Sequence, residues 1–214
     1  LANKIPLKSN KFKYRKMLKL KRKELVIALL PGSRMGELKA HTDTLLETAQ
    51  NLLEVHPDAK FLIPATNDKN VHFIKGRIRN NPTKNLKLIK GKVDEILSSS
   101  NIAIAASGTA SLQIALHKKP MIIIYKGSWI SYFIWKMVRL IPNVSLPNIL
   151  LNENFVPEML QHRATPNLLS EKACKIINDK KYLKKIEFKF NRLHKDLKKN
   201  TSSLIFKIIK PYLK

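Results

Sequence analysis

Between residues 25 and 125, short apolar runs alternate with longer stretches of helical periodicity. The apolar runs lie at residues 25–30, 60–63, 86–89, 101–106 and 121–125. Between them, residues 37–55, 69–80, 93–99 and 109–117 have the composition and spacing of helices. Continuous apolar runs that alternate with helices are typical of parallel strands covered by helices on both faces. The pattern therefore predicts a doubly wound α/β sheet.

Small-residue turns follow two of the predicted strands, and each precedes a predicted helix. The first turn is Pro31-Gly32-Ser33-Arg34, and the second is Ser107-Gly108-Thr109. A helix N-terminus offers unpaired backbone N–H groups and the positive end of the helix dipole to an anion. In such sheets ligands bind outside the carboxyl ends of the strands. We therefore expect both turns, with a third at Tyr125-Lys126-Gly127, to surround a ligand that carries a diphosphate.

The side chains of these turns suit a phosphate site without a metal. Gly32 and Gly108 allow the backbone to approach a ligand closely, and Arg34 adds a fixed positive charge. Hydroxyl donors come from Ser33, Ser107 and Thr109. The chain has no Asp-x-Asp pair, and its six histidines lack metal-ligand spacing. We therefore expect neither a metal nor a cofactor.

A net charge of +26 accompanies these motifs, and lysine supplies most of it along the whole chain. The sequence has no zinc-finger spacing, no aromatic RNA-reading signature and no arginine-rich recognition helix. We therefore attribute the charge to compositional bias together with attraction to anionic lipid rather than to binding of nucleic acid, which we do not expect as a partner. A lone Cys174 excludes an intramolecular disulfide and fits a reducing cytoplasm.

Aromatic and cationic residues are mixed in the segment from Trp129 to Leu140. No apolar stretch of the chain reaches the roughly 18 residues that span a bilayer. The mixture suits a helix that lies in the interfacial zone of a membrane, and it equally suits a partly buried helix or a subunit contact. Both interpretations remain open at this point.

The chain divides into three parts by composition. Residues 1–24 are basic and lack a settled period, so we expect a linker from an N-terminal lobe that is missing. Residues 25–165 form the α/β domain, and residues 166–214 form lysine-rich helices that begin at a Thr165-Pro166 cap.

Five motifs occur in the order and spacing of one family. They are Pro31–Arg34 with Glu37, Ala106–Ala110, Val144–Leu150, Val156–Glu158 and Ala164–Pro166. From about residue 25 to residue 169, the chain resembles the C-terminal half of lipid-A-disaccharide synthase. The resemblance implies one Rossmann-like lobe of a two-lobed GT-B glycosyltransferase, located in the cytoplasm at the inner face of the inner membrane.

The same resemblance implies a reaction and its partners. Family members are inverting hexosyltransferases that transfer 2,3-diacylglucosamine from UDP to 2,3-diacylglucosamine 1-phosphate (lipid X). The product is the β-1,6 disaccharide of lipid A, and UDP is released. This chain would carry the donor half, whereas the general base would lie in the missing N-terminal lobe. Expected partners are UDP-diacylglucosamine, lipid X, the membrane surface, and the missing lobe or a second copy; activity of this chain alone is left open.

Ten residues of this chain are implied as donor contacts, with Arg34 also stabilising the leaving group. They are Gly32, Ser33, Arg34, Ser107, Gly108, Thr109, Gln113, Tyr125, Lys126 and Asn148. Gln113 stands where the family usually has Glu, whose carboxylate accepts two hydrogen bonds from a ribose diol, so we expect weaker ribose binding here. Asn148 follows Pro147 in a predicted loop, where it is either a ligand contact or a plain turn residue.

Two other classes of protein fit parts of the sequence. One is a different UDP-sugar enzyme of the same architecture, such as an epimerase or a peptidoglycan glycosyltransferase, although the Ser145–Asn148 motif speaks against it. The other is a non-catalytic basic remnant that binds nucleic acid, an alternative for which the net charge is the only support.

Overall fold

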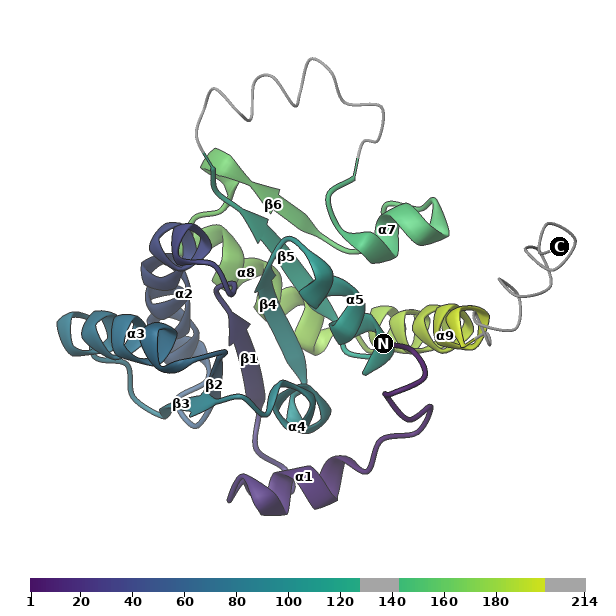
Figure 1. The fold of residues 1–214 in the computed structure, drawn as a ribbon, viewed down its shortest axis with the longest axis horizontal. Coiled ribbons are helices and arrows are strands. Elements are labelled where there is room, and N and C mark those ends of the chain that lie inside the picture. The colour runs from purple at the N-terminus through teal and green to yellow at the C-terminus, as the bar shows by residue number, and fades with distance from the viewer. Residues whose placement is uncertain (128–142, 199–214) are drawn as a thin grey trace, which may run out of the picture.

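The structure is a computed structural model that describes residues 1–127 and 143–198. In it, the chain forms a six-stranded parallel sheet with the strand order β3-β2-β1-β4-β5-β6 (Figure 1). The strands are β1 Val26–Leu30, β2 Lys60–Ala65, β3 Leu86–Lys90, β4 Ile102–Ala106, β5 Met121–Tyr125 and β6 Glu158–Leu160. The chain runs from β1 outward to β3 and then returns to place β4 on the other side of β1. The strand order therefore reverses between β1 and β4, where such sheets bind ligands.

Helices follow the strands on both faces of the sheet. They are α1 Lys11–Met17, α2 Met35–Val55, α3 Asp68–Asn80, α4 Val93–Ser99, α5 Thr109–Leu116, α7 Leu146–Leu151, α8 Pro166–Asn178 and α9 Lys180–Leu197. A short 3-10 turn spans Gln161–Arg163. The predicted doubly wound α/β class is confirmed, and each strand predicted before residue 126 agrees with the observed one within two residues.

Alternate residues of each central strand pack into two separate cores. In β1, Ile27 and Leu29 join a core with α2, α3 and α8, whereas Val26, Ala28 and Leu30 face α4, α5 and α9. Successive side chains of a strand point to opposite faces, so both faces of β1 must be apolar. The helices α8 and α9 thus cover the sheet on opposite faces, and the predicted Thr165 cap accepts a hydrogen bond from the Leu168 N–H.

The structure contains α1, α7 and β6, which the sequence did not predict. Helix α1 lies within residues 1–24, where we expected a linker, and Arg15 on α1 is only 2% exposed. Its guanidinium donates to the Ser99 carbonyl at 3.0 Å and to Asn101 Oδ1 at 2.7 Å. These bonds fix α1 against the amino end of β4, so this segment packs on the domain. Within the described residues, no helix is long and apolar enough to cross a bilayer.

The first turn depends on close contact between Gly32 and Glu37. Gly32 has φ +114°, a conformation that side chains with a Cβ rarely adopt. A Cβ at this position would lie 2.4 Å from Glu37 Cβ and from Glu37 Oε2. Glycine therefore serves both the backbone conformation of the turn and the position of the Glu37 carboxylate.

We predict that Gly32→Ala lowers the free energy of unfolding by about 1–3 kcal/mol, because alanine strains the turn. Gly36→Ala is the matched control, because a Cβ at Gly36 meets nothing within 4 Å and φ there is ordinary. The control should change stability by less than about 1 kcal/mol. Urea unfolding of both variants measures the difference, and equal midpoints would contradict this account of the turn.

Candidate functional site

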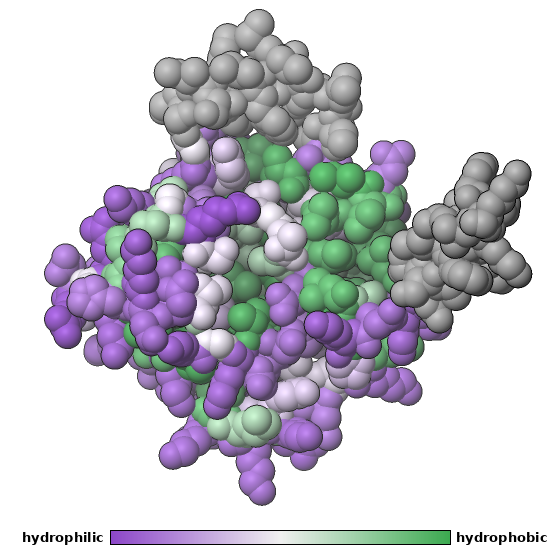
Figure 2. Space-filling view, viewed as in Figure 1, coloured by the Kyte–Doolittle hydropathy of each residue, from purple (hydrophilic) through white to green (hydrophobic). Residues whose placement is uncertain are grey.

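The three predicted turns meet at the carboxyl ends of β1, β4 and β5. A hollow of about 450 Å³ is lined by residues of the first two turns and by Gln113. A neighbouring hollow of about 790 Å³ shares Arg34 and Ser107 with it and extends to Tyr125 and Lys126. Nine of the ten predicted contact residues line one or both hollows, and Asn148 lines neither. Figure 2 shows hydrophilic side chains over α3 and apolar ones over α5 and α7, on either side of these strand ends.

In the first turn, a carboxylate already occupies the backbone donors. Glu37 Oε2 accepts from the N–H groups of Ser33 at 2.8 Å and Arg34 at 3.2 Å. Burial alone would raise the pKa of Glu37, but these two donors and the Arg34 guanidinium together lower it below its ordinary value. The expectation that these N–H groups await a phosphate is therefore wrong for this conformation. The Arg34 side chain is 86% exposed and pairs with Glu37 at 3.1 Å, so its guanidinium remains accessible to a ligand.

The second turn leaves its helix N-terminus open. Gly108 caps α5 with φ +145°, and no side chain of the described residues supplies a capping hydrogen bond there. A Cβ at Gly108 would meet no atom within 4 Å, so there is room for a ligand beside the backbone. Thr109 and Ala110, whose N–H groups lack acceptors within the helix, line the hollow. This turn is therefore the better anion site of the two.

Ser107 holds the second turn in place. Its N–H donates to the Ile124 carbonyl at 2.9 Å, and its hydroxyl donates to the Val144 carbonyl at 2.9 Å. The hydroxyl proton is thus engaged within the protein, and only the lone pairs of the oxygen remain for a ligand. The predicted role of Ser107 as a hydroxyl donor does not fit this geometry.

At the third turn, Lys126 is tied to α2. Its Nζ donates to Thr44 Oγ1 at 2.7 Å, and its backbone N–H donates to Nε2 of His41 at 3.0 Å. His41 also contacts the Pro31 carbonyl, with 3.1 Å between Nδ1 and the oxygen. Lys126 also lines the second hollow, so its side chain adds positive charge near that hollow.

Gln113 is part of a polar cluster that sequence reasoning missed. Its Nε2 donates to Asp94 Oδ1 at 2.7 Å, and Nε2 of His117 lies 2.8 Å from the same oxygen. Burial lowers the pKa of His117 although Asp94 opposes this effect, so His117 donates as a neutral ring. Burial alone would raise the pKa of Asp94, but its hydrogen bonds with His117 and Gln113 lower it. The spacing of Gln113 and His117, four residues apart on one helix, was the available signal.

Asn148 has a structural position rather than a place in the site. It is fully buried in α7, so the predicted loop is wrong. Its Nδ2 donates to the Val156 carbonyl and to Glu158 Oε1, both at 2.9 Å. Its Oδ1 accepts from the N–H groups of Phe155 at 3.2 Å and Val156 at 2.9 Å. Because the protein uses the whole amide, we remove Asn148 from the donor contacts.

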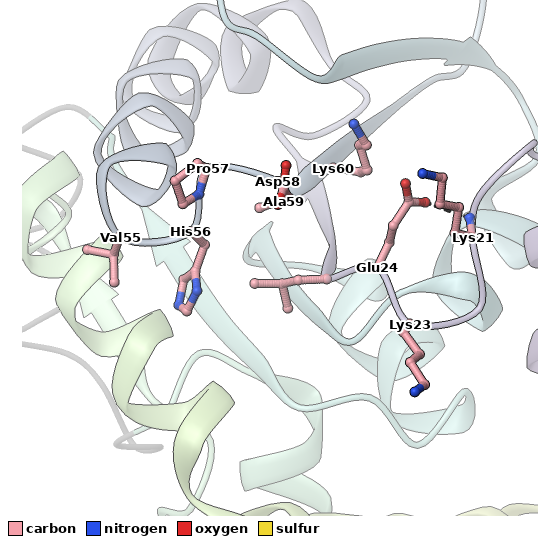
Figure 3. A pocket seen from close by; sticks show the side chains of 10 residues that line it. Lys21, Lys23, Glu24, Val55, His56, Pro57, Asp58, Ala59 and Lys60 are labelled. Atoms are coloured by element: carbon pink, nitrogen blue, oxygen red, sulfur yellow. Dashed lines mark hydrogen bonds between the residues drawn. The ribbon is translucent and has the colours of Figure 1, made fainter.

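A further hollow of about 540 Å³ lies at the amino ends of β1 and β2 (Figure 3). Lys21, Lys23 and Lys60 line it together with Glu24 and Asp58, so its charges are mixed. It lies at the opposite end of the strands from the three turns, and none of the described helices begins there. Among the residues that the structure describes, no three His, Cys, Asp or Glu side chains gather as a metal site requires. The hollow at the strand carboxyl ends is therefore the better candidate.

Comparison with known proteins identifies the family. The model of a family described as lipid-A-disaccharide synthetase matches residues 1–209, beyond both ends of the segment that carries the motifs. The lipid-A-disaccharide synthase of Dechloromonas aromatica is 38% identical over 206 residues, which cover 94% of this chain and 54% of that protein. That of Methylobacillus flagellatus is 34% identical over 216 residues, covering 100% of this chain and 57% of that protein.

The solved structures show the same fold. The C-terminal domain of a group 1 glycosyl transferase (LpcC) from Francisella tularensis aligns with a TM-score of 0.58 and 15% identity. The alignment covers 89% of this chain and 94% of that domain, and the fold is that of one lobe of a GT-B glycosyltransferase. The present chain spans about half the length of the curated relatives it matches. By its sequence, this chain belongs to the lipid-A-disaccharide synthase family.

Proposed function

We propose that this chain is the donor-binding lobe of a glycosyltransferase of lipid A biosynthesis. The donor is UDP-2,3-diacylglucosamine, the acceptor is lipid X, and the products are the β-1,6 disaccharide and UDP. The observation that carries the proposal is the open N-terminus of α5 beside Arg34, at the point where the strand order reverses, in a chain of this family. The acceptor site and the general base belong, in this proposal, to the other lobe of the whole protein.

Departure of UDP from the sugar builds negative charge on the diphosphate. Fixed donors that face this charge lower the barrier more than donors that must reorganise during the reaction. The N–H groups at the N-terminus of α5 are such donors, because the two hydrogen bonds of Ser107 hold the backbone just before them. The exposed Arg34 guanidinium adds a charge that can bind two phosphate oxygens at once. In this proposal Glu37 holds the first turn, and Tyr125 and Lys126 line the path toward the sugar.

We predict that the chain binds UDP in the presence of a chelator, because α5 and Arg34 provide the positive potential that a metal would otherwise supply. Arg34→Ala should weaken UDP binding by about 1.5–3 kcal/mol, the range for a hydrogen bond to a charged group. Isothermal titration calorimetry with and without chelator measures both effects.

The matched control is Arg79→Ala, because Arg79 is an exposed arginine near the far end of α3. It should leave the UDP affinity unchanged. Strict dependence on a divalent metal would contradict the proposal, as would equal losses for the two variants. Competition by duplex DNA at moderate salt would instead favour the nucleic-acid alternative that the charge suggests.

The cluster around Gln113 changes what a substitution there should do. We place the ribose beside Gln113, whose carbonyl oxygen is not engaged by Asp94. The sequence alone suggested that Glu at this position would bind the ribose diol better. In the folded chain, however, Nε2 of Gln113 lies 2.7 Å from Asp94 Oδ1. A glutamate at position 113 would place a carboxylate oxygen there instead of this amide nitrogen. Two carboxylates in contact repel each other, so Asp94 must lose its charge before the carboxylate can help.

We therefore predict that Gln113→Glu alone does not strengthen UDP binding. The double variant Gln113→Glu/Asp94→Asn should strengthen it by about 1 kcal/mol, because an amide at position 94 still accepts from His117. Calorimetry with UDP and with 2′-deoxy-UDP tests the placement of the ribose. A gain in the single variant, or an equal gain with the deoxy ligand, would rule it out.

We also propose that the chain works at the surface of an anionic membrane, because both substrates are lipids. Support comes from the net charge of +26 and from the aromatic residues of the segment Trp129–Leu140. That segment lies outside the described residues, so an interfacial helix and a buried helix or subunit contact both remain open for it. A second copy of the chain and the other lobe remain proposed partners.

For the membrane proposal, we predict that binding to anionic vesicles is weakened but not abolished by high salt. Replacing Trp129, Phe133 and Trp135 by Ser should remove the salt-resistant part, because apolar insertion is lost. Phe188→Ser is the control, since Phe188 is 72% exposed on α9 outside this segment. Vesicle sedimentation at low and high salt measures both parts. Undiminished binding of the triple variant at high salt would favour a buried helix or a subunit contact.

A further inference from the structure

His41 connects two of the three turns that form the site. It lies on α2, is 2% exposed, and lines the second hollow. Nδ1 lies 3.1 Å from the Pro31 carbonyl oxygen, which can only accept a hydrogen bond. Nε2 lies 3.0 Å from the backbone N–H of Lys126, which can only donate. These partners assign the neutral ring with its proton on Nδ1.

The two turns joined in this way come from strands that are not neighbours. Pro31 follows β1 and Lys126 follows β5, and β4 lies between these strands in the sheet. The His41 ring therefore bridges across the carboxyl end of β4, where Ser107 begins the second turn. Thr44, one helical turn farther along α2, binds the ammonium group of the same lysine. The relative position of the first and third turns thus depends on one face of α2.

Protonation of His41 would break one of its two bonds. An imidazolium carries a proton on both nitrogens, so Nε2–H would face the N–H of Lys126 with no acceptor between them. Burial lowers the pKa of His41 below its usual value, and the Pro31 carbonyl partly opposes this effect. The charged groups that act on the ring are Glu37 on the same helix, which favours protonation, and Lys126 from the end of β5, which disfavours it. We therefore expect the bridge to form at neutral pH and to be lost when the ring is protonated in acid.

We propose that His41 is a positioning residue of the donor site, which joins the first and third turns only as a neutral imidazole and thereby makes nucleotide binding sensitive to acid. This inference rests on the proposed binding of UDP at these turns. Both ring nitrogens of His41 are engaged within the protein, so in this proposal it acts through Pro31 and Lys126. Its protonation state then sets how well the site is ordered before the ligand arrives.

The first arm of the test needs no nucleotide. Two-dimensional NMR of the full chain follows the imidazole nitrogens of His41 and the backbone amide of Lys126 between about pH 5 and about pH 7.5. We expect the neutral ring to carry its proton on Nδ1, and the Lys126 amide to titrate together with the ring. A Lys126 amide that does not respond when the ring is protonated would overturn the bridge itself.

The second arm compares UDP binding by the parent chain and two variants over the same pH range. His41→Gln retains one N–H donor and one acceptor, so it should keep the neutral-pH affinity within about threefold. His41→Leu keeps an apolar side chain but removes both bonds, and it should lose about tenfold or more at neutral pH. Below the ordinary pKa of histidine, the parent should lose more affinity than the glutamine variant. Protonation of UDP itself is common to all the proteins and cancels in this comparison.

The control is His162→Gln, because His162 is exposed and lies outside both hollows. It should reproduce the parental pH profile. If the His41→Gln profile also matches the parent, His41 does not tune the site and the inference is wrong. If the parent chain does not bind UDP at any pH, the proposed function is wrong, and so is the claim that the bridge supports UDP binding. The NMR arm still decides whether the bridge exists.

Discussion

The burial of both faces of the sheet is the constraint on which the rest of this structure depends. All five residues of β1 and of β4 are buried, with alternate side chains in two different cores. A strand packed on both faces has no room for unpaired polar groups, which are costly to bury. Polar chemistry is therefore confined to the strand ends. At the carboxyl ends the helices begin, and their N-termini supply the donors that an anionic ligand needs.

Two turns that look alike in the sequence have become different in the fold. Both place glycine at a positive φ before a helix, yet only the first has a glutamate that accepts the backbone N–H groups of Ser33 and Arg34. The carboxylate fixes the first turn and presents Arg34 to solvent. The second turn, capped by Gly108 alone, keeps its donors for a ligand. In our account, the first turn supplies a movable charge and the second supplies a fixed backbone cradle.

The sequence predicted the elements whose signal is local. Periodicity was sufficient for β1 to β5 and for α2 to α5, because each packs apolar side chains of its own against one of the two cores. It missed α1, whose position depends on the bonds of Arg15 to residues more than eighty positions away. Contacts that form only in the fold leave no local signal in the sequence. For this reason the sequence did not reveal that residues after α7 engage the amide of Asn148, or that Asp94 and His41 bind partners distant in the chain. Nine of the ten contact residues line the hollows because motif spacing identifies strand ends well.

The most direct test of the central claim is a map of the backbone amides of the chain during titration with UDP in the presence of a chelator. We expect the largest chemical-shift changes at Gly108, Thr109 and Ala110, with smaller changes at Ser33 and Arg34. Residues around Lys21 and Lys60, at the opposite end of the strands, should not change. Changes centred on those lysines, or none at the N-terminus of α5, would contradict the assignment of the donor site.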